Sequence, residues 1–427
     1  MLLTKLYPPL APPSLVPRPR LIAQLEAGLA GKLTLVSAPP GFGKTSLLAS
    51  WLAGRASAWL SLDEEDNDPT RFLAYLLAAL QQIDGRWGAT AAPLLASASP
   101  TALLSLLLND LSQYPTAGVL VLDDYHVITA ESIHTALTFW VDHLPPHLHL
   151  ILTSRADPPL PLARWRVRRH LNEIRTADLR FTAEETAQFW REHMGEPIPS
   201  PALATLAERT EGWVASLHLA ALSLRGRSAS EAAEFVRSFT GSHAFIVDYL
   251  VEEVLHQQAP ADQEFLLHTA VLDQLNGDLV NALLGRTDGH AVLERLYKAN
   301  LFLIPLDQER RWYRYHHLFR EALLGRLPAP TRANLHRRAG QWLARHGRLR
   351  QAIPHALATG DEAQAAEYLE TIAPQLLEQN ELASLHHWFG QLSAAVVEAR
   401  LPLLLAEGWA LALWGARFGR RHIARAG

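Results

Sequence analysis

Cysteine is absent from the 427 residues of this sequence. Its absence excludes a disulfide scaffold, a thiol nucleophile and zinc sites with thiolate ligands, and it fits a reducing compartment. Charge is also scarce, because only 19% of the residues are charged and the formal net charge is −4. The net charge of the chain therefore provides no overall electrostatic attraction to nucleic acid or to an acidic membrane. Apolar residues make up 48% of the chain, which leaves ample material for packed cores.

Long hydrophobic runs are missing as well. Residues 1–20 are interrupted by Pro and Arg and lack the continuous apolar core of a signal peptide. The longest apolar stretches, such as 76–80, are far shorter than the roughly 20 residues that a membrane-spanning helix needs. We therefore expect a cytoplasmic protein with no membrane partner, built from about two to four compact units.

The first part of the chain alternates β-rich runs with helical patterns, which predicts an α/β domain with a parallel sheet covered by helices. Asp68 and Pro69 have the residue types of an N-cap and of a first helical position. The predicted strands are 33–37, 58–62, 119–122 and 148–153, and the predicted helices are 44–53, 70–83 and 131–143.

After about residue 181 the strand patterns nearly vanish. Thr182 and Glu185 have the spacing of a capping box. A β-hairpin is predicted at 301–306 and 311–315, so that helices lead into a hairpin as in a winged helix. Beyond residue 332, short helical hairpins resemble the start of a helical repeat, and no capping repeat follows, which we interpret as truncation. The helices predicted in this part are 201–209, 213–224, 231–239, 246–257 and 291–298.

A phosphate-binding loop is the clearest motif of the chain. The strand predicted at 33–37 runs into the loop and then into a helix, which is the context that this motif requires. Its glycines let backbone N–H groups converge on phosphates, Lys44 should reach the β- and γ-phosphates, and the Thr45 hydroxyl should bind Mg²⁺. Ala38 stands where the pattern usually has its first glycine, and a chance glycine-rich turn would not explain the whole combination. The residues expected to bind nucleotide here are Pro40, Gly41, Phe42, Gly43, Lys44, Thr45 and Ser46.

Two acidic residues, Asp123 and Asp124, directly follow the predicted strand 119–122. We expect Asp123 to bind Mg²⁺, directly or through water, in the Walker B arrangement, and Asp124 to polarise the attacking water. Alternatively, Asp124 only caps the next segment. Arg155 follows the strand 148–153, and neighbouring parallel strands deliver their carboxyl ends to the same edge. It is therefore a candidate for contacting the γ-phosphate, with a plain surface charge as the alternative.

Two other groups of residues are weaker candidates. The run 164–170 interleaves arginines with Trp165, as nucleic-acid surfaces do, but its alternation also fits one solvated strand face, which we favour. His143, His147 and His149 flank a Pro-Pro loop without the spacing or the carboxylates of a metal site.

Taken together, these motifs resemble the MalT-like ATPases of the STAND class of signal-transduction ATPases. The resemblance covers nearly the whole chain, and the combination is more specific than the phosphate loop alone. The runs that carry it are 15–21, 38–45, 59–63, 66–69, 122–126, 152–155, 179–182 and 210–213. It implies a P-loop NTPase of the ASCE/STAND type followed by all-α helical, winged-helix and TPR-like repeat domains. The expected limits are 1–30 for an N-terminal adenine clamp, 31–180 for the ATPase domain, 181–240 for the helical domain, 241–327 for the winged helix and 328–427 for the truncated repeat region.

The resemblance also implies roles for single residues. Val16, Pro17 and Arg18 would hold the adenine, and His316 would touch the nucleotide in a closed state, with His317 as a close rival. Both histidines could otherwise be helix-cap or core residues. Many relatives carry a proline of a Gly-x-Pro-like motif near the adenine, and the stretch 216–219 lacks it.

The function that the resemblance implies is a switch with ATP/ADP and Mg²⁺ as cofactors. An ADP-bound form would be closed and monomeric, and ATP with a small-molecule or protein inducer would open it for self-association. The resembled regulators bind DNA through a C-terminal LuxR-type helix-turn-helix domain, and these 427 residues show no candidate recognition helix. The alternatives are a catalytic ATPase or phosphotransferase with a helical substrate-binding domain, and a scaffold with a vestigial site. Slow hydrolysis would separate the switch from the enzyme.

Overall fold

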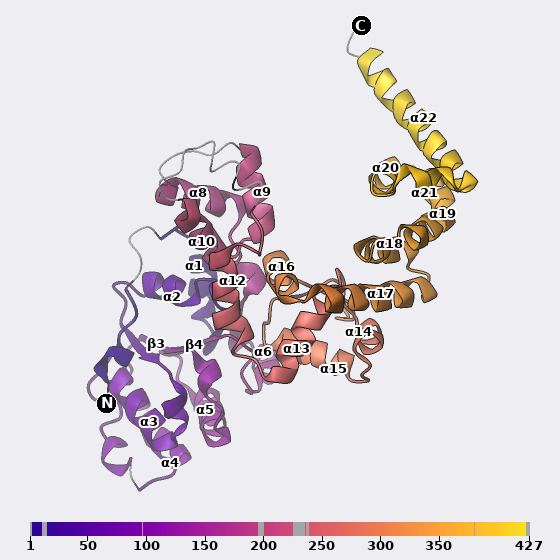
Figure 1. Ribbon diagram of the computed structural model, residues 1–427. Coiled ribbons are helices and arrows are strands. Elements are labelled where there is room, and N and C mark those ends of the chain that lie inside the picture. The colour runs from indigo at the N-terminus through magenta and orange to yellow at the C-terminus, as the bar shows by residue number, and fades with distance from the viewer. Residues whose placement is uncertain are drawn as a thin grey trace. The chain divides into compact units, whose positions relative to one another are not determined.

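A parallel sheet of five strands forms the centre of the first part of the chain (Figure 1). Four of the strands begin and end within one residue of the predicted ones, and the fifth, β5 (Leu171–Arg175), is missing from the prediction because its residues are mostly polar. The arrangement confirms the predicted α/β P-loop NTPase fold. The strand order is β2 (Ser57–Ser61), β3 (Gly118–Asp123), β4 (Leu148–Ser154), β1 (Leu33–Ser37) and β5 (Leu171–Arg175).

The structure, a computed structural model, describes residues 2–10, 15–95, 97–194, 200–224, 235, 239–379 and 381–423, without the side chains of 200 and 413–423. The predicted helix 231–239 lies almost entirely outside these residues. The chain forms two units, one of 1–257, 295–303 and 316–319 and the other of 258–294, 304–315 and 320–427. Among the described residues we find no helix with both the length and the apolarity to cross a bilayer.

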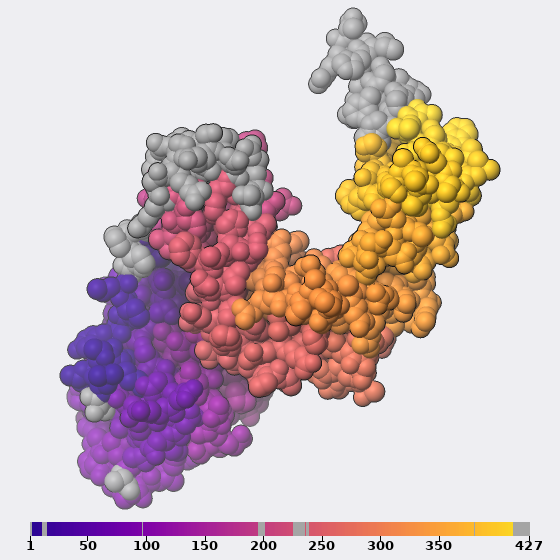
Figure 2. Space-filling view, in the orientation of Figure 1, coloured from indigo at the N-terminus to yellow at the C-terminus, as the bar shows by residue number. Residues whose placement is uncertain are grey.

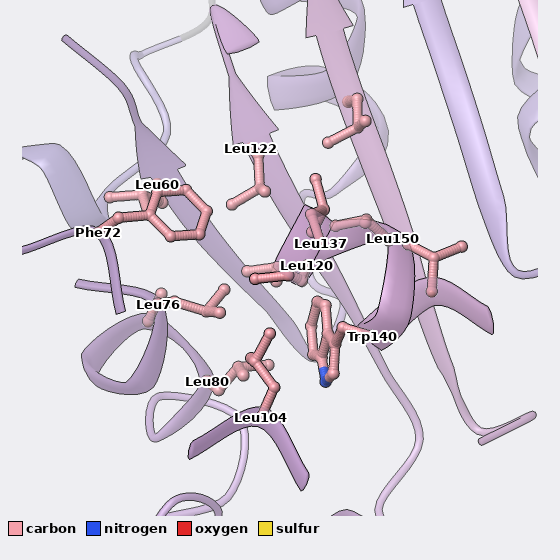
Figure 3. Close-up of a cluster of buried hydrophobic side chains, with 14 of the residues drawn as sticks. Leu60, Phe72, Leu76, Leu80, Leu104, Leu120, Leu122, Leu137, Trp140 and Leu150 are labelled. Atoms are coloured by element: carbon pink, nitrogen blue, oxygen red, sulfur yellow. The ribbon is translucent and has the colours of Figure 1, made fainter. Parts of the chain in front are cut away.

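Three helices pack against one face of the sheet: α3 (Pro69–Leu80), α4 (Pro100–Gln113) and α5 (Glu131–His143). The Asp68 side chain caps α3 by accepting from the Arg71 N–H at 2.7 Å, as predicted. Alternate strand residues share one face of a sheet, and helix residues four apart share one face of a helix. Figure 3 shows the resulting core, made of Leu60, Leu120, Leu122 and Leu150 from the strands and Phe72, Leu76, Leu80, Leu104, Leu137 and Trp140 from the helices.

One prediction about the sheet domain is wrong. The run 164–170 is not a solvated strand face, because its first part belongs to a short helix, α6 (Leu162–Val167). The Trp165 side chain is fully buried, and its indole N–H donates to Asp142 at 2.7 Å, whereas Val167 is 86% exposed. Two aromatic or apolar residues are too few to distinguish the period of a strand from that of a single helical turn.

Helices follow the sheet, as predicted. Thr182 and Glu185 form the expected capping box at the start of α8 (Ala183–Met194), since the side chain of each accepts a hydrogen bond from the backbone N–H of the other at 3.0–3.2 Å. The predicted helix 246–257 is divided, because α12 (Ala244–Leu250) continues as a π-helical turn, η5 (Val251–Leu255). The other helices of the first unit are α1 (Pro19–Gly28), α2 (Lys44–Trp51), α7 (Thr176–Leu179), α8 (Ala183–Met194), α9 (Ser200–Thr210) and α10 (Val214–Leu224).

A two-stranded sheet of β6 (Leu303–Pro305) and β7 (Tyr313–Tyr315) forms the predicted hairpin. Gly347 and Gly360 adopt the left-handed conformation that commonly ends helices, with φ of 71° and 76°. The helices beside the hairpin are α13 (Pro260–Thr269), α14 (Gly277–Leu284), α15 (Gly289–Lys298) and α16 (His317–Arg326). The arm that continues from orange to yellow in Figure 2 consists of α17 (Ala329–Arg345), α18 (Leu349–Ala358), α19 (Glu362–Glu378), α20 (Leu382–Phe389), α21 (Ala394–Glu398) and α22 (Leu401–Ile423).

Candidate nucleotide-binding site

The phosphate-binding loop connects β1 to α2 through two glycines in the left-handed conformation. Gly41 has a φ of 78° and Gly43 a φ of 75°, and α2 begins directly after them at Lys44. A methyl group built on Gly41 would come within 2.5 Å of the Ala215 Cβ and 2.8 Å of the Trp213 Nε1. Glycine is therefore required at position 41 both by conformation and by the close approach of another segment.

Lys44 is buried against the loop that it follows. Its ammonium group donates to the backbone carbonyls of Ala38 at 2.8 Å and Pro39 at 3.0 Å. Burial lowers the pKa of Lys44 to about 8, although the nearby charge of Asp124 acts in the opposite direction. A phosphate group would stabilise this desolvated cation, because oppositely charged groups attract strongly away from water. Ala38, in place of the usual glycine, is fully buried and supplies one of the two acceptors.

Thr45 and Asp123 meet at the carboxyl edge of the sheet. The Thr45 hydroxyl lies 3.3 Å from both carboxylate oxygens of Asp123, and the Thr153 hydroxyl donates to one of them at 2.5 Å. Burial raises the pKa of Asp123 to about 6. A carboxylate and a hydroxyl are hard oxygen ligands of the kind that Mg²⁺ prefers. The donor set therefore fits the predicted metal, and the cation would replace the solvation that Asp123 loses on burial.

Asp124 adopts an unusual backbone conformation beside this pair. Its φ is 59°, a left-handed value that is uncommon outside glycine, and its N–H donates to the Thr153 hydroxyl at 2.8 Å. No side-chain capping bond joins Asp124 to the short 3₁₀ helix η4 (Tyr125–Val127) that follows. The carboxylate is 44% exposed and lies 3.7 Å from the His126 Nδ1. Burial lowers the pKa of that imidazole to about 4, so His126 is neutral beside the acid.

Arg155 follows β4, the strand that lies between β1 and β3 in the sheet. Its guanidinium contacts Glu253 twice, with the backbone carbonyl and one carboxylate oxygen both at 3.3 Å. Because β4 runs parallel to its neighbours β1 and β3, its carboxyl end lies at the same edge of the sheet as the phosphate loop and Asp123. Sequence analysis alone gave no sign of Glu253, which belongs to the π-helical turn η5.

A cavity of about 580 Å³ adjoins the phosphate loop. The three residues predicted to hold adenine, Val16, Pro17 and Arg18, line it together with Phe42 and Gly43. The lining residues that the sequence analysis missed recur at helical spacing on α1, α2 and α10, which is a detectable signal once the helices are placed. They are Ile22, Ala23, Leu47, Ser50, Val214 and His218, the last within the stretch 216–219. Phe181, between α7 and α8, lines the cavity from outside these helices, and the rest of the lining is Leu15, Pro19 and Ser46.

Arg18 is part of the wall of this cavity and is held in place by its neighbours. Its guanidinium donates to the Arg180 carbonyl at 2.9 Å and to Glu185 at 3.1 Å, and it lies 4.7 Å from the centre of the Phe181 ring. Burial lowers the pKa of Arg18 while Glu185 raises it. The ion pair fixes the segment that precedes α1 against the start of α8, so the cavity has a preformed wall.

His316 does not line the cavity. Its Nε2 lies 3.0 Å from the Thr210 carbonyl, and its ring packs edge to face against Trp213 and Phe302 at centroid distances of 5.9 and 5.7 Å. His317 is 63% exposed at its side chain. The Trp213 indole N–H in turn donates to the Pro40 carbonyl at 3.1 Å. His316 thus reaches the phosphate loop through Trp213.

Comparisons with known proteins agree with this layout. The MalT winged helix domain family matches residues 251–335, which overlap the predicted winged helix at 241–327. The chain is 38% identical over 416 residues to the HTH-type transcriptional regulator MalT of Serratia proteamaculans, a match that covers 95% of this chain and 46% of that protein. The chain is MalT-like.

A second relative is named as a protein kinase. The MalT-like chain is 35% identical over 418 residues to the serine/threonine-protein kinase PknK of Mycobacterium tuberculosis, covering 95% of the chain and 38% of the kinase. The chain therefore spans less than half the length of these curated relatives. Among solved structures, a Walker-type ATPase of Pyrococcus abyssi matches 73% of the chain and 96% of its own, with a TM-score of 0.53 and 15% identity. That likeness supports the P-loop ATPase fold.

Proposed function

We propose that the MalT-like chain is the nucleotide-dependent switch of a bacterial transcriptional regulator. The observation that carries this proposal is the composition of the cavity wall. Val16 precedes the ATPase sheet, Phe42 belongs to the phosphate loop, and Val214 begins a helix of the following helical segment. A base bound in the cavity would touch all three parts. Occupancy of the site would thereby determine how these parts of the chain pack together.

The phosphates and the metal would bind beside this cavity. Backbone N–H groups at the start of α2 and the Lys44 ammonium would hold the phosphates, and Thr45 with Asp123 would hold Mg²⁺. The metal would neutralise phosphate charge when bound. Asp124 would orient a water molecule. We expect hydrolysis to be slow, as suits a switch.

Two states follow from this arrangement. An ADP-bound closed state would be monomeric, and ATP together with a small-molecule or protein inducer would favour an open state that self-associates. His316 would contribute to closure through Trp213, since that contact joins it to the phosphate loop. Transcription would be activated through a DNA-binding domain outside these 427 residues.

Nucleotide affinity and turnover test the proposal together. Calorimetry with ADP and ATP in the presence of Mg²⁺ should show binding of both nucleotides, and Lys44→Ala should weaken both. Phosphate release should be slow compared with the 1–10³ s⁻¹ that is typical of enzymes. Turnover in that ordinary range would instead support the catalytic ATPase or phosphotransferase. A wild-type chain that binds neither nucleotide would support the scaffold.

A further inference from the structure

The ion pair of Arg155 and Glu253 connects the edge of the ATPase sheet to a segment almost a hundred residues further along the chain. Two contacts form it, one with the carboxylate oxygen and one with the backbone carbonyl of Glu253, each at 3.3 Å. The side chains are 34% and 45% exposed, so both remain accessible to solvent. A pair of this kind is weak enough to be exchanged for a stronger partner.

The surroundings of the pair place it next to the phosphate site. Burial lowers the pKa of Lys44 to about 8, and the positive charge of Arg155 also lowers it. On the other side, burial raises the pKa of Tyr249 to about 12, and the charge of Glu253 adds to this effect. The Tyr249 hydroxyl lies 3.0 Å from where a Cβ on Gly41 would be. Arg155 and Glu253 therefore belong to one electrostatic cluster with the phosphate loop.

Glu253 occupies a distinctive backbone position. It lies in η5, where the His256 N–H bonds to the Val251 carbonyl at 2.9 Å across a π-helical turn. Such turns are rare and are frequent at functional sites. The Glu253 carbonyl accepts from Arg155, so the arginine holds both the backbone and the side chain of this turn. Loss of the arginine would remove both contacts at once.

We propose that Glu253 is a positioning residue that competes with the γ-phosphate of ATP for Arg155. This inference rests on the proposed function, because it requires that the site bind adenine nucleotides. ADP has no γ-phosphate and leaves Arg155 with Glu253, which keeps η5 attached to the end of β4. ATP offers a more highly charged acceptor, so Arg155 leaves Glu253 and η5 loses its attachment. The carboxylate of Glu253 thus lowers the affinity for ATP relative to that for ADP.

The test compares four chains: wild type, Glu253→Gln, Arg155→Gln and the double variant. Glu253→Gln keeps the shape of the side chain and removes its charge. We expect it to raise the ratio of ATP affinity to ADP affinity by about two- to five-fold, which is the range that a half-exposed ion pair allows. Glu252→Gln is the matched control, because Glu252 is an exposed neighbour in the same turn, and it should leave the ratio unchanged.

The Arg155→Gln background separates competition from a general effect of charge. There, adding Glu253→Gln should change the ratio by less than the measurement error, because the arginine for which both acceptors compete is absent. An equal rise in both backgrounds, or an equal rise for ATP and ADP in the single variant, would overturn the inference. Failure of the proposed function gives a different result in the wild-type chain, which then either binds neither nucleotide or turns over ATP at an ordinary enzymatic rate.

Discussion

The Trp213 indole N–H donates a hydrogen bond to the Pro40 carbonyl at 3.1 Å, across 173 positions of sequence. A second hydrogen bond joins the same two segments: the Ala215 N–H donates to the Gly41 carbonyl at 2.9 Å. Trp213 also packs against His316. The start of α10 therefore holds the outer side of the phosphate loop, while the helix also lines the cavity. Any movement of the phosphate loop on binding phosphate would therefore alter the hydrogen bond and the packing of Trp213.

Trp213→Phe should weaken nucleotide binding while keeping the chain folded. The phenyl ring keeps most of the aromatic packing, but the Pro40 carbonyl loses its donor, a loss of about 1 kcal/mol or about five-fold in affinity. Calorimetric titration with ADP measures the effect. Trp140→Phe is the control for reduced volume, because the Trp140 indole N–H is buried with no hydrogen-bond partner among the described residues. Equal losses in both variants would show that the hydrogen bond is irrelevant.

Gly41→Ala should abolish nucleotide binding at concentrations that saturate the wild type. The new methyl group would lie 2.5 Å from the Ala215 Cβ at a left-handed φ, so the loop or α10 must move. Gly54→Ala is the matched control: its φ of 79° imposes the same backbone cost of about 1–2 kcal/mol, but nothing lies within 4 Å of the added methyl. It should lower stability and preserve binding, as fluorescence titration and thermal unfolding would show. Normal binding by Gly41→Ala would refute the assigned role of the loop.

Asp123→Asn should remove most of the Mg²⁺ dependence of ATP binding. The neutral amide keeps the size of the side chain but is a poorer ligand for a hard cation than a carboxylate. ATP affinity is measured with Mg²⁺ and with excess EDTA in the wild type and the variant. The ratio of the two affinities should approach one in the variant. An unchanged ratio would place the metal elsewhere.

His355 makes the second unit sensitive to acid. Its Nδ1 lies 2.8 Å from the His336 Nδ1, and Asp273 and Arg320 are the charged groups nearby. Burial lowers the pKa of His355 to about 4, so the folded chain binds fewer protons than the unfolded chain once the pH falls below about 6.5. Stability should therefore fall by roughly 2 kcal/mol between pH 6.5 and pH 5, and the loss should be complete below about pH 4.

Thermal unfolding followed by circular dichroism at pH 7 and pH 5 tests this. His355→Gln should be less stable than the wild type at pH 7 and should lose less stability on acidification. His346→Gln changes an exposed histidine and should keep the wild-type pH dependence. The same loss on acidification in all three chains would exclude the buried pair as its source.

Local patterns predict much of the fold and of the phosphate site. The apolar strand before the loop, the acids at the end of β3 and the capping box at Thr182 are each contained in a few consecutive residues, and the structure places them as expected. The winged-helix hairpin follows from two short β-rich runs. These features depend on neighbours in sequence, so periodicity and turn chemistry suffice to find them.

Contacts between distant segments escape such patterns. Glu253 meets Arg155 across 98 positions, and neither residue has a local feature that indicates the other. Of the stretch 216–219, which the resemblance places near the adenine, only His218 lines the cavity, whereas Ser216 and Leu217 are buried and Val214 lies before the stretch. The helix that contains them has to be placed before its cavity face is known. The short helix α6 has the alternation of a strand in its sequence, because a single helical turn carries too little periodicity to distinguish the two.

The nucleotide-dependent switch is tested by the identity of the nucleotide that co-purifies with the chain, combined with the mass of the particle in ADP·Mg²⁺ and in ATP·Mg²⁺. Mass photometry or analytical ultracentrifugation gives the mass, and chromatography of the denatured sample gives the nucleotide. A nucleotide-dependent switch predicts retained ADP, a monomer in ADP and a larger particle in ATP. A chain that retains no nucleotide and has the same mass in both solutions would show that nucleotide does not switch its assembly.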